Sequence, residues 1–444
     1  MQTKILQLIH EKKWQEVQEE IKDLNAVNIA ESFEDLDNND VLILFRILPK
    51  DLAADVFSHL SREDQMVIVQ SFANKEIEHI LEELRFDDMI DFLEEVPANL
   101  VKRILKNTTE EKRELINQFL KYPENSAGSL MTIEYVEFKK NLTVRAALNN
   151  IKKTGMNKET VYTCYVTNPK RKLEGIVPLR KLVTSELDTT IEEIMYTDVI
   201  HVHTHDDQEE VAHVFKKYDF IALPVVDKEN RLVGIITIDD IIDVIEQEST
   251  EDFQIMAGMQ PSEDEYLKTS VFTLSRHRIT WLLILMISAT FTGRIIQHYE
   301  DVLQSVVILT SFIPMLMDTG GNAGSQSSTL VIRGMALGEI DSNDYWKVFS
   351  KELQVSILVG LMLAGINFLR IFYLQKVGLN ISLVVSGALF LTVVLAKIVG
   401  GILPLGAKKL KLDPAIMASP LITTIVDASS LMVYFLLATK FLGI

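Results

Sequence analysis

Hydrophobic residues in the first quarter of the chain recur with a period of twelve. Three phases of this pattern repeat together, and the first phase consists of Leu36, Leu48, Leu60, Phe72, Leu84 and Val96. Twelve residues suit one short helix and a turn, so consecutive units would bury their apolar faces against their neighbours. The pattern therefore predicts an all-α, superhelical domain over residues 1–130.

Strands and helices alternate over residues 131–248, and the alternation is present twice. Each copy begins at a methionine, Met131 or Met195, and continues through a helix into a β-rich run. A glycine followed by a second apolar strand comes next in each copy, at Gly175 and at Gly234. Such alternation is typical of α/β structure. The repetition predicts two copies of one module.

The last part of the chain, residues 276–444, contains five apolar runs, at residues 278–297, 302–332, 353–374, 381–405 and 414–442. A helix needs roughly 20 residues to cross the hydrocarbon core of a membrane. We therefore expect a five-helix transmembrane domain, joined to the front half by a long connecting helix over residues 249–275. The loops on one side are the more basic ones, so the N-terminal domains are expected in the cytoplasm and the C-terminus outside.

Charge separates the two halves of this multidomain membrane protein. The first 270 residues carry a net charge of −22, whereas the remainder carries +4. Such an acidic front half repels nucleic acid and attracts cations, so no nucleic-acid partner is expected; an ordinary acidic surface explains the charge equally well. Cys164 is the only cysteine, which excludes a disulfide within the chain and indicates a reducing compartment.

The last apolar run carries a single carboxylate, Asp427, near its middle. An ionisable side chain inside a membrane costs on the order of 3 kcal/mol, so it normally faces a wet cavity or a partner. Asp427 is therefore the first candidate for a functional residue.

The second apolar run is unusually polar and rich in glycine, with the sequence GGNAGSQSS at residues 320–328. Irregular backbone and polar groups at membrane depth are tolerated inside protein or beside water. This stretch is expected to line a polar path. Close packing of helices through small residues is the alternative.

The second α/β copy resembles the CBS module, through LPVVD at residues 223–227 and GIITIDD at residues 234–240. In CBS pairs the acid of the second motif commonly holds a nucleotide ribose, so the resemblance implies an ATP site at Thr237 and Asp240. The first copy has Lys181 where the second has its acid. A pair that only dimerises and transmits strain is the open alternative.

The whole chain, in order, resembles the MgtE family of magnesium channels. The match rests on residues 314–333, on Asp413-Pro414-Ala415 and on PLITTIVD at residues 420–427. The resemblance implies a homodimer in membrane lipid with a Mg²⁺ pore on its two-fold axis. The pore residues that it implies are Asp427, Thr423, Ser419 and Ser325. Mg²⁺ keeps much of its water shell, so paired carboxylates can hold it through water.

The same resemblance implies cytosolic Mg²⁺ sites that close the pore when the ion is plentiful. Acids of the three cytosolic parts would share bound ions, and the positions that match are Asp55, Asp87, Asp91, Glu209, Asp219, Asp240, Asp243, Glu248, Glu251 and Asp252. Adjacent acids repel one another, and a divalent ion removes that repulsion.

The resemblance, together with the lone acid of the last apolar run, implies a Mg²⁺-selective channel for uptake across the plasma membrane, closed by cytosolic Mg²⁺. Two alternatives stay open: a secondary carrier that couples a divalent cation to Na⁺ or H⁺, and a membrane receptor whose CBS pair senses a nucleotide. An enzyme is not expected, because the sequence shows no nucleophile with a base and no phosphate-binding loop.

Overall fold

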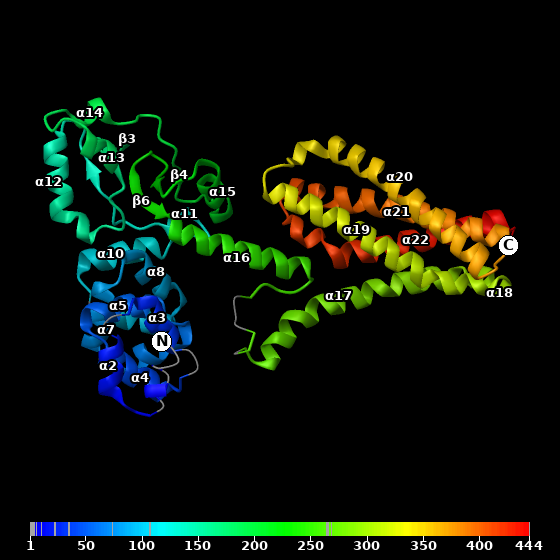
Figure 1. Ribbon diagram of the computed structural model, residues 1–444, viewed down its shortest axis with the longest axis horizontal. Helices are drawn as coiled ribbons and strands as arrows, with labels where there is room; N and C mark the ends of the chain where they lie inside the picture. The colour runs from blue at the N-terminus through cyan, green and yellow to red at the C-terminus, as the bar shows by residue number, and fades with distance from the viewer. Residues whose placement is uncertain are drawn as a thin grey trace. The chain divides into compact units, whose positions relative to one another are not determined.

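The computed structural model forms two compact units, Met1–Ile245 and Glu246–Ile444 (Figure 1). It describes residues 5–443, apart from residues 6, 10, 22–23, 34–35, 73, 106–107, 263–265 and 268. The side chains of residues 50, 51, 74, 75, 78, 95, 342 and 419 are likewise not described.

The predicted twelve-residue period is confirmed, because seven successive helices begin twelve residues apart. After α2 (Trp14–Ile21), α3 (Ala26–Ala30) and the 3₁₀ turn η1 (Glu31–Phe33), these helices are α4 (Asn38–Ile47), α5 (Lys50–Ser58), α6 (Arg62–Ser71), α7 (Asn74–Glu83), α8 (Phe86–Glu95), α9 (Ala98–Leu105) and α10 (Glu110–Phe119).

Repeating aromatic residues lock neighbouring helices of this domain together. Phe45 makes edge-to-face contacts with Phe57 and Phe72, and Phe57 makes another with Phe92. All four rings are buried. Helix starts are fixed by extended capping residues such as Asp37, whose carboxylate accepts hydrogen bonds from the first-turn amides.

The predicted duplication of the α/β region is also confirmed. The first copy contains β1 (Glu137–Phe138), α12 (Val144–Thr154), η2 (Gly155–Asn157), β2 (Thr163–Thr167), β3 (Leu173–Pro178) and α13 (Leu179–Thr184); the second contains β4 (Val202–His203), α15 (Gln208–Tyr218), β5 (Ala222–Val226) and β6 (Leu232–Thr237). The short helices α11 (Ala127–Leu130) and α14 (Ile191–Ile194) precede them. In each sheet the first strand pairs parallel with the second, which pairs antiparallel with the third.

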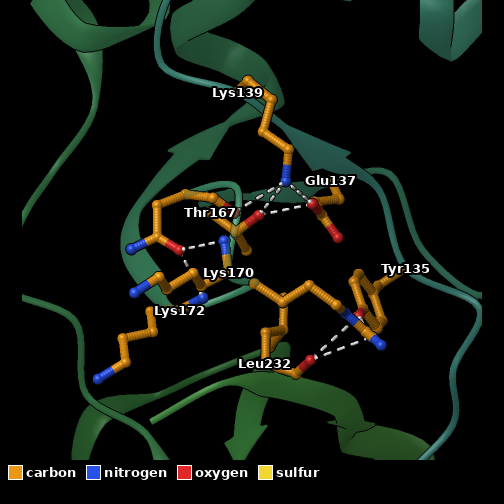
Figure 2. A network of polar contacts seen from close by, with 9 residues as sticks. Tyr135, Glu137, Lys139, Thr167, Lys170, Lys172 and Leu232 are labelled. Atoms are coloured by element: carbon orange, nitrogen blue, oxygen red, sulfur yellow. Dashed lines mark hydrogen bonds and ion pairs between the residues drawn. The ribbon is translucent and has the colours of Figure 1, made fainter.

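A polar network holds the first copy together and ties it to the second (Figure 2). Lys139 donates to Thr167 Oγ1 at 2.7 Å and contacts Glu137, so β1 and β2 are joined through their side chains. Arg171 donates to Tyr135 Oη at 3.1 Å and to the Leu232 carbonyl at 3.2 Å, across the two copies. The basic turn between β2 and β3 therefore has a structural role.

Helix α16 (Ile238–Met256) continues directly from the last strand of the second copy. The prediction of one connecting helix over residues 249–275 was wrong in its bounds. The helix ends at Met256, residues 259–262 have no regular structure, and α17 begins at Val271. Gly258 has a φ of +69°, a left-handed conformation that suits glycine after a helix end, and Ser270 caps the next helix.

The apolar part contains α17 (Val271–His298), α18 (Glu300–Ser305), η3 (Val307–Phe312), α19 (Ile313–Ala336), η4 (Ser342–Asp344), α20 (Tyr345–Leu369), the π-helical turn η5 (Arg370–Leu374), α21 (Leu379–Lys409), η6 (Pro414–Met417) and α22 (Ser419–Leu442). Helices α19 to α22 lie side by side, and α21 contacts the other three (Figure 1).

Four helices in the described part of the chain are long and apolar enough to cross a membrane: the spans are Val271–His298, Tyr345–Leu374, Leu379–Lys409 and Pro414–Leu442. Helix α19 is not one of them, so the count of five spans is not confirmed. The predicted second span, residues 302–332, is divided among α18, η3 and α19. Pro314 stands in the first turn of α19, where its missing N–H costs nothing, and so marks a new helix start.

The backbones of α19 and α21 touch at a glycine pair. A Cβ added at Gly400 would overlap the Gly324 carbonyl oxygen, which belongs to rigid helical backbone. We expect Gly400→Ala to lower the free energy of unfolding by about 1–3 kcal/mol, because the two helices must separate. Gly387→Ala in the same helix has nothing within 4 Å of its added Cβ and serves as the control. Equal thermal stability of both variants in detergent would contradict the close contact.

Candidate metal sites

Asp427 lies in the third turn of α22, and Thr423 lies one turn before it. Both side chains are half-buried. The Asp427 Oδ1 atom is fully covered by protein and has no hydrogen-bond partner among the described residues. A buried carboxylate oxygen without a donor is costly, unless a cation or water satisfies it. This oxygen is therefore the strongest indication of a cation site in the apolar unit.

Helix α19 packs closely on this part of α22. A Cβ at Gly321 would come within 2.9 Å of Thr423 Cγ2, and one at Gly324 within 2.6 Å of Ile422 Cγ2. Ser328 Oγ donates to the Met417 carbonyl at 2.9 Å, just before α22 begins. The glycines of the GGNAGSQSS stretch thus bring α19 against the helix that carries Asp427.

A second acid, Asp318 in α19, stands close enough to Asp427 for the two charges to interact. Asn322 Nδ2 donates to Asp318 Oδ1 at 3.2 Å. Asp318 was not predicted from the sequence as a site residue, although any acid in an apolar run carries the same energetic cost as Asp427. Asp318 did not stand out in the sequence, because it lies next to the polar stretch at residues 320–328.

One face of α19 is polar and exposed in the single chain. Asp318, Asn322 and Gln326 are spaced four residues apart and are all exposed, whereas Ala323 and Ser327 are buried against other helices. Polar side chains at membrane depth are not left facing lipid. The face formed by Asp318, Asn322 and Gln326, hereafter the α19 polar face, therefore requires water or another polar surface.

Two predicted pore residues have weaker structural support. Ser325 in α19 is half-buried beside the α19 polar face. Ser419 begins α22, but its side chain lies outside the described residues. The roles of both, like that of Thr423, stay predictions.

In the first unit, acids from the helical domain and the α/β copies converge. Asp87 in α8 is 9% exposed, and its Oδ1 atom has no hydrogen-bond partner among the described residues. Burial, together with the charges of Asp240, Asp88 and Glu159, raises the pKa of Asp87 to about 8. This carboxylate is thus poorly solvated and surrounded by like charges.

Asp240 is the partner acid, in the first turn of α16. Burial, with the charges of Asp239 and Glu159, raises its pKa to about 7, although hydrogen bonds from Thr237 oppose the rise. Thr237 Oγ1 donates to Asp240 Oδ2 at 2.7 Å. Burial and Asp240 also raise the pKa of Asp91, but the Asp91 side chain is exposed, whereas Asp87 is buried and Asp240 is half-buried.

Glu159, which was not predicted as a site residue, belongs to the same group of acids. Its Oε2 atom lies 2.9 Å from Arg85 Nη1, and Glu134 lies 3.6 Å from the same guanidinium nitrogen. Burial raises the pKa of Glu159, while the Arg85 charge lowers it. Glu159 follows the 3₁₀ turn η2 in the first α/β copy, where no hydrophobic period predicts contacts.

The other predicted sensor acids are more dispersed. Asp55 adds its charge to the surroundings of Asp88. Of the predicted sensor acids in the first unit, Asp55, Glu209, Asp219 and Asp243 are exposed, as Asp91 is. Glu248, Glu251 and Asp252 lie on the part of α16 that belongs to the second unit. Within the described ranges, no three His, Cys, Asp or Glu side chains form a ready metal site.

The predicted nucleotide residues, Thr237 and Asp240, are paired with each other, as described above. The corresponding residue of the first copy, Lys181, places its ammonium 3.9 Å from the centre of the Tyr196 ring. The two copies therefore present different chemistry at equivalent positions.

Three family models match the chain. They are described as a divalent cation transporter, over residues 313–437, an MgtE intracellular N domain, over residues 24–125, and a CBS domain, over residues 191–247. The CBS match covers the second copy, which is the copy with the fuller motif.

Curated relatives and solved structures agree with these matches. The chain is 35% identical to the magnesium transporter MgtE of Thermus thermophilus, over 95% of this chain and 94% of the relative. It is 32% identical to the magnesium transporter MgtE of Bacillus subtilis, over 99% and 97%. A crystal structure of the cytosolic domain of the Mg²⁺ channel MgtE in complex with ATP is similar at a TM-score of 0.52, with 34% identity, over 55% of this chain and 100% of that one.

Proposed function

Because this chain belongs to the MgtE family of magnesium transporters, which are not enzymes, we propose that it is a Mg²⁺-selective channel for uptake across the plasma membrane. One observation carries the proposal: the buried Asp427 Oδ1 has no donor, on a helix that packs against α19 at Gly321 and Gly324. A hydrated Mg²⁺ ion would supply both the missing charge and the missing donors, through its water shell.

A homodimer accounts for both polar features of the apolar unit. If two subunits meet along a two-fold axis, the α19 polar face and Asp427 of each line one path. Asp318 would then be a second acid on this path, with Thr423, Ser419 and Ser325 as further contacts for the ion's water. In this arrangement the N-terminal domains are cytoplasmic and the C-terminus lies outside.

Cytosolic Mg²⁺ would close the channel through the acids around Asp87 and Asp240. Their raised pKa values mean that the compact arrangement of the first unit is opposed by charge. Binding of a divalent cation to this arrangement alone would shift the population toward it. The other acids of the predicted sensor set, on the second CBS copy and on α16, would contribute further sites.

ATP binding to the CBS pair is part of the proposal. Thr237 and Asp240 are the residues that would bind the ribose. The solved relative with ATP supports it, and the already formed Thr237–Asp240 hydrogen bond would hold the acid in place. Asp240 would then take part in both ATP binding and Mg²⁺ sensing, so each ligand is expected to alter the affinity for the other.

Flux measurements separate the channel from the carrier alternative, which the interacting acids Asp318 and Asp427 also allow. For the full-length protein in liposomes with a Mg²⁺-sensitive dye inside, we expect Mg²⁺ entry that is unchanged when Na⁺ and H⁺ gradients are collapsed. Entry that stops with either gradient would support a coupled carrier. No entry at all would leave the nucleotide-sensing receptor.

A further inference from the structure

Three charged or polar side chains meet inside the helix bundle, away from the α19 polar face. Lys397 lies in the middle of α21 and is 6% exposed, and Ser327 in α19 is 1% exposed. Glu352, half-buried in the second turn of α20, completes the group. No residue of this group was assigned a role above.

The three side chains form a continuous hydrogen-bonded chain across three helices. Lys397 Nζ donates to Ser327 Oγ at 3.4 Å, and Ser327 Oγ donates to Glu352 Oε2 at 2.6 Å. The serine hydroxyl accepts from the cation and donates to the anion, which is the direction that polarises both bonds favourably. The hydroxyl thus bridges a buried ammonium group and a half-buried carboxylate.

A glycine on α21 leaves space for the Glu352 side chain beside this bridge. Gly401, one turn after Lys397, faces Glu352, and a Cβ there would come within 2.8 Å of Glu352 Cγ. The adjacent Gly400 contacts α19, as described above. The two glycines therefore admit α19 on one side of α21 and the Glu352 stem on the other.

Stability alone does not explain a charge pair at this depth. Replacing a buried ion pair by apolar residues is often neutral or stabilising, because the pair must be stripped of water. Removing one member, in contrast, leaves a full charge in a medium of low dielectric, where its field extends over many ångströms. The intact pair carries no net charge, whereas the member that remains after one substitution carries a full charge.

The location makes this field relevant to conduction. Ser327 is on the same helix as Asp318, Asn322 and Gln326, on its buried side, so the charge pair stands one helix behind the proposed ion path. We infer that Lys397 and Glu352, bridged by Ser327, set the net charge behind the pore wall, and that Glu352 keeps the Lys397 charge from repelling divalent cations. This inference rests on the proposed channel function.

The test compares the signs of two single substitutions and their combination, as Mg²⁺ entry into liposomes that contain the full-length protein. Glu352→Gln leaves Lys397 unneutralised, and we expect entry to fall by about tenfold, the effect of one unit charge at moderate distance. Lys397→Gln leaves a negative charge, and entry should stay at or above the level of the unmodified protein. The double variant is neutral again, so entry should return to within about twofold of that level.

A purely structural bridge predicts another pattern. Lys397→Gln would then reduce entry as strongly as Glu352→Gln, and the double variant would be no better than either; that result overturns the inference. If Lys397→Gln does not fold, as judged by elution profile and thermal stability, the charge swap Glu352→Lys with Lys397→Glu takes its place, and loss of entry in the folded swap contradicts the inference. Absence of entry in the unmodified protein would instead remove the proposed channel function itself.

Discussion

Asp427→Asn is expected to reduce Mg²⁺ entry by at least about a hundredfold while leaving the protein folded. Asparagine keeps the size of the side chain and removes the charge that an ion with a tightly held water shell requires. In a homodimer, one substitution removes the charge from both subunits, so two interactions of more than 1 kcal/mol each are lost at an effective dielectric of about 20. The measurement is dye-reported entry into liposomes at equal protein content.

The control for this substitution is Asp301→Asn, which removes an exposed acid from the start of α18 in the same unit. Its entry rate should match that of the unmodified protein. Asp318→Asn should give an intermediate loss, of about tenfold, because its carboxylate is exposed and is held by Asn322. Near-normal entry with Asp427→Asn, at unchanged thermal stability, would refute the assignment of the ion site.

Asp87→Asn is expected to make the compact arrangement of the first unit independent of Mg²⁺. In the unmodified protein, burial and the Asp240 charge oppose an ionised carboxylate at position 87. Asparagine removes both costs, so the arrangement should persist in a chelator, where the unmodified protein opens. Limited proteolysis of the full-length protein, with and without millimolar Mg²⁺, measures this difference.

The pH dependence of the unmodified protein follows from the same pKa shift. A carboxyl whose pKa is raised favours the arrangement that raises it only while the group is protonated. The contribution of Asp87 is therefore complete below its ordinary pKa, near 4, and is lost as the pH rises through about 8. Without Mg²⁺, protease resistance should fall progressively from about pH 4 to about pH 8 and change little above that, and each unit of pKa shift corresponds to about 1.4 kcal/mol.

Asp87→Asn should flatten most of this pH response, and Asp240, with a pKa of about 7, should account for the remainder. Glu76→Gln in α7 offers a control outside the acidic group. The sensor proposal would be wrong if Asp87→Asn and the unmodified protein showed the same protease sensitivity in chelator and the same response to Mg²⁺.

Local repetition made much of the fold predictable from the sequence. The twelve-residue period places a helix start at each repeat from Asn38 to Glu110, because one short helix and one turn determine it. The CBS duplication was equally readable, since Gly175 and Gly234 occupy the same position in β3 and β6. In both cases the pattern that predicts the element lies within one repeat unit and recurs in the next.

The boundaries and contacts that depend on distant residues could not be predicted in this way. The connecting helix ends at Met256 because the chain turns at Gly258, whose added Cβ would overlap Trp281. The second apolar run breaks before α19, which hydropathy alone does not reveal.

The same distinction between local pattern and distant contact applies to the candidate sites. An isolated acid such as Asp427 is conspicuous in an apolar run, so its position was predictable. The partners Asp318, Glu159 and Lys397 were missed, because their importance comes from side chains on other elements. Hydrogen bonds and charge interactions between helices leave no periodic trace in the sequence.

The most direct test of the account is a structure of the full-length protein in a membrane mimetic, determined with Mg²⁺ and again with chelator. We predict a difference-density peak on the two-fold axis of a homodimer, between the Asp427 carboxylates and within reach of their water-mediated contacts. Asp427 side chains that point away from each other into lipid or into packed helices, with no density between the subunits, would contradict the proposed ion path.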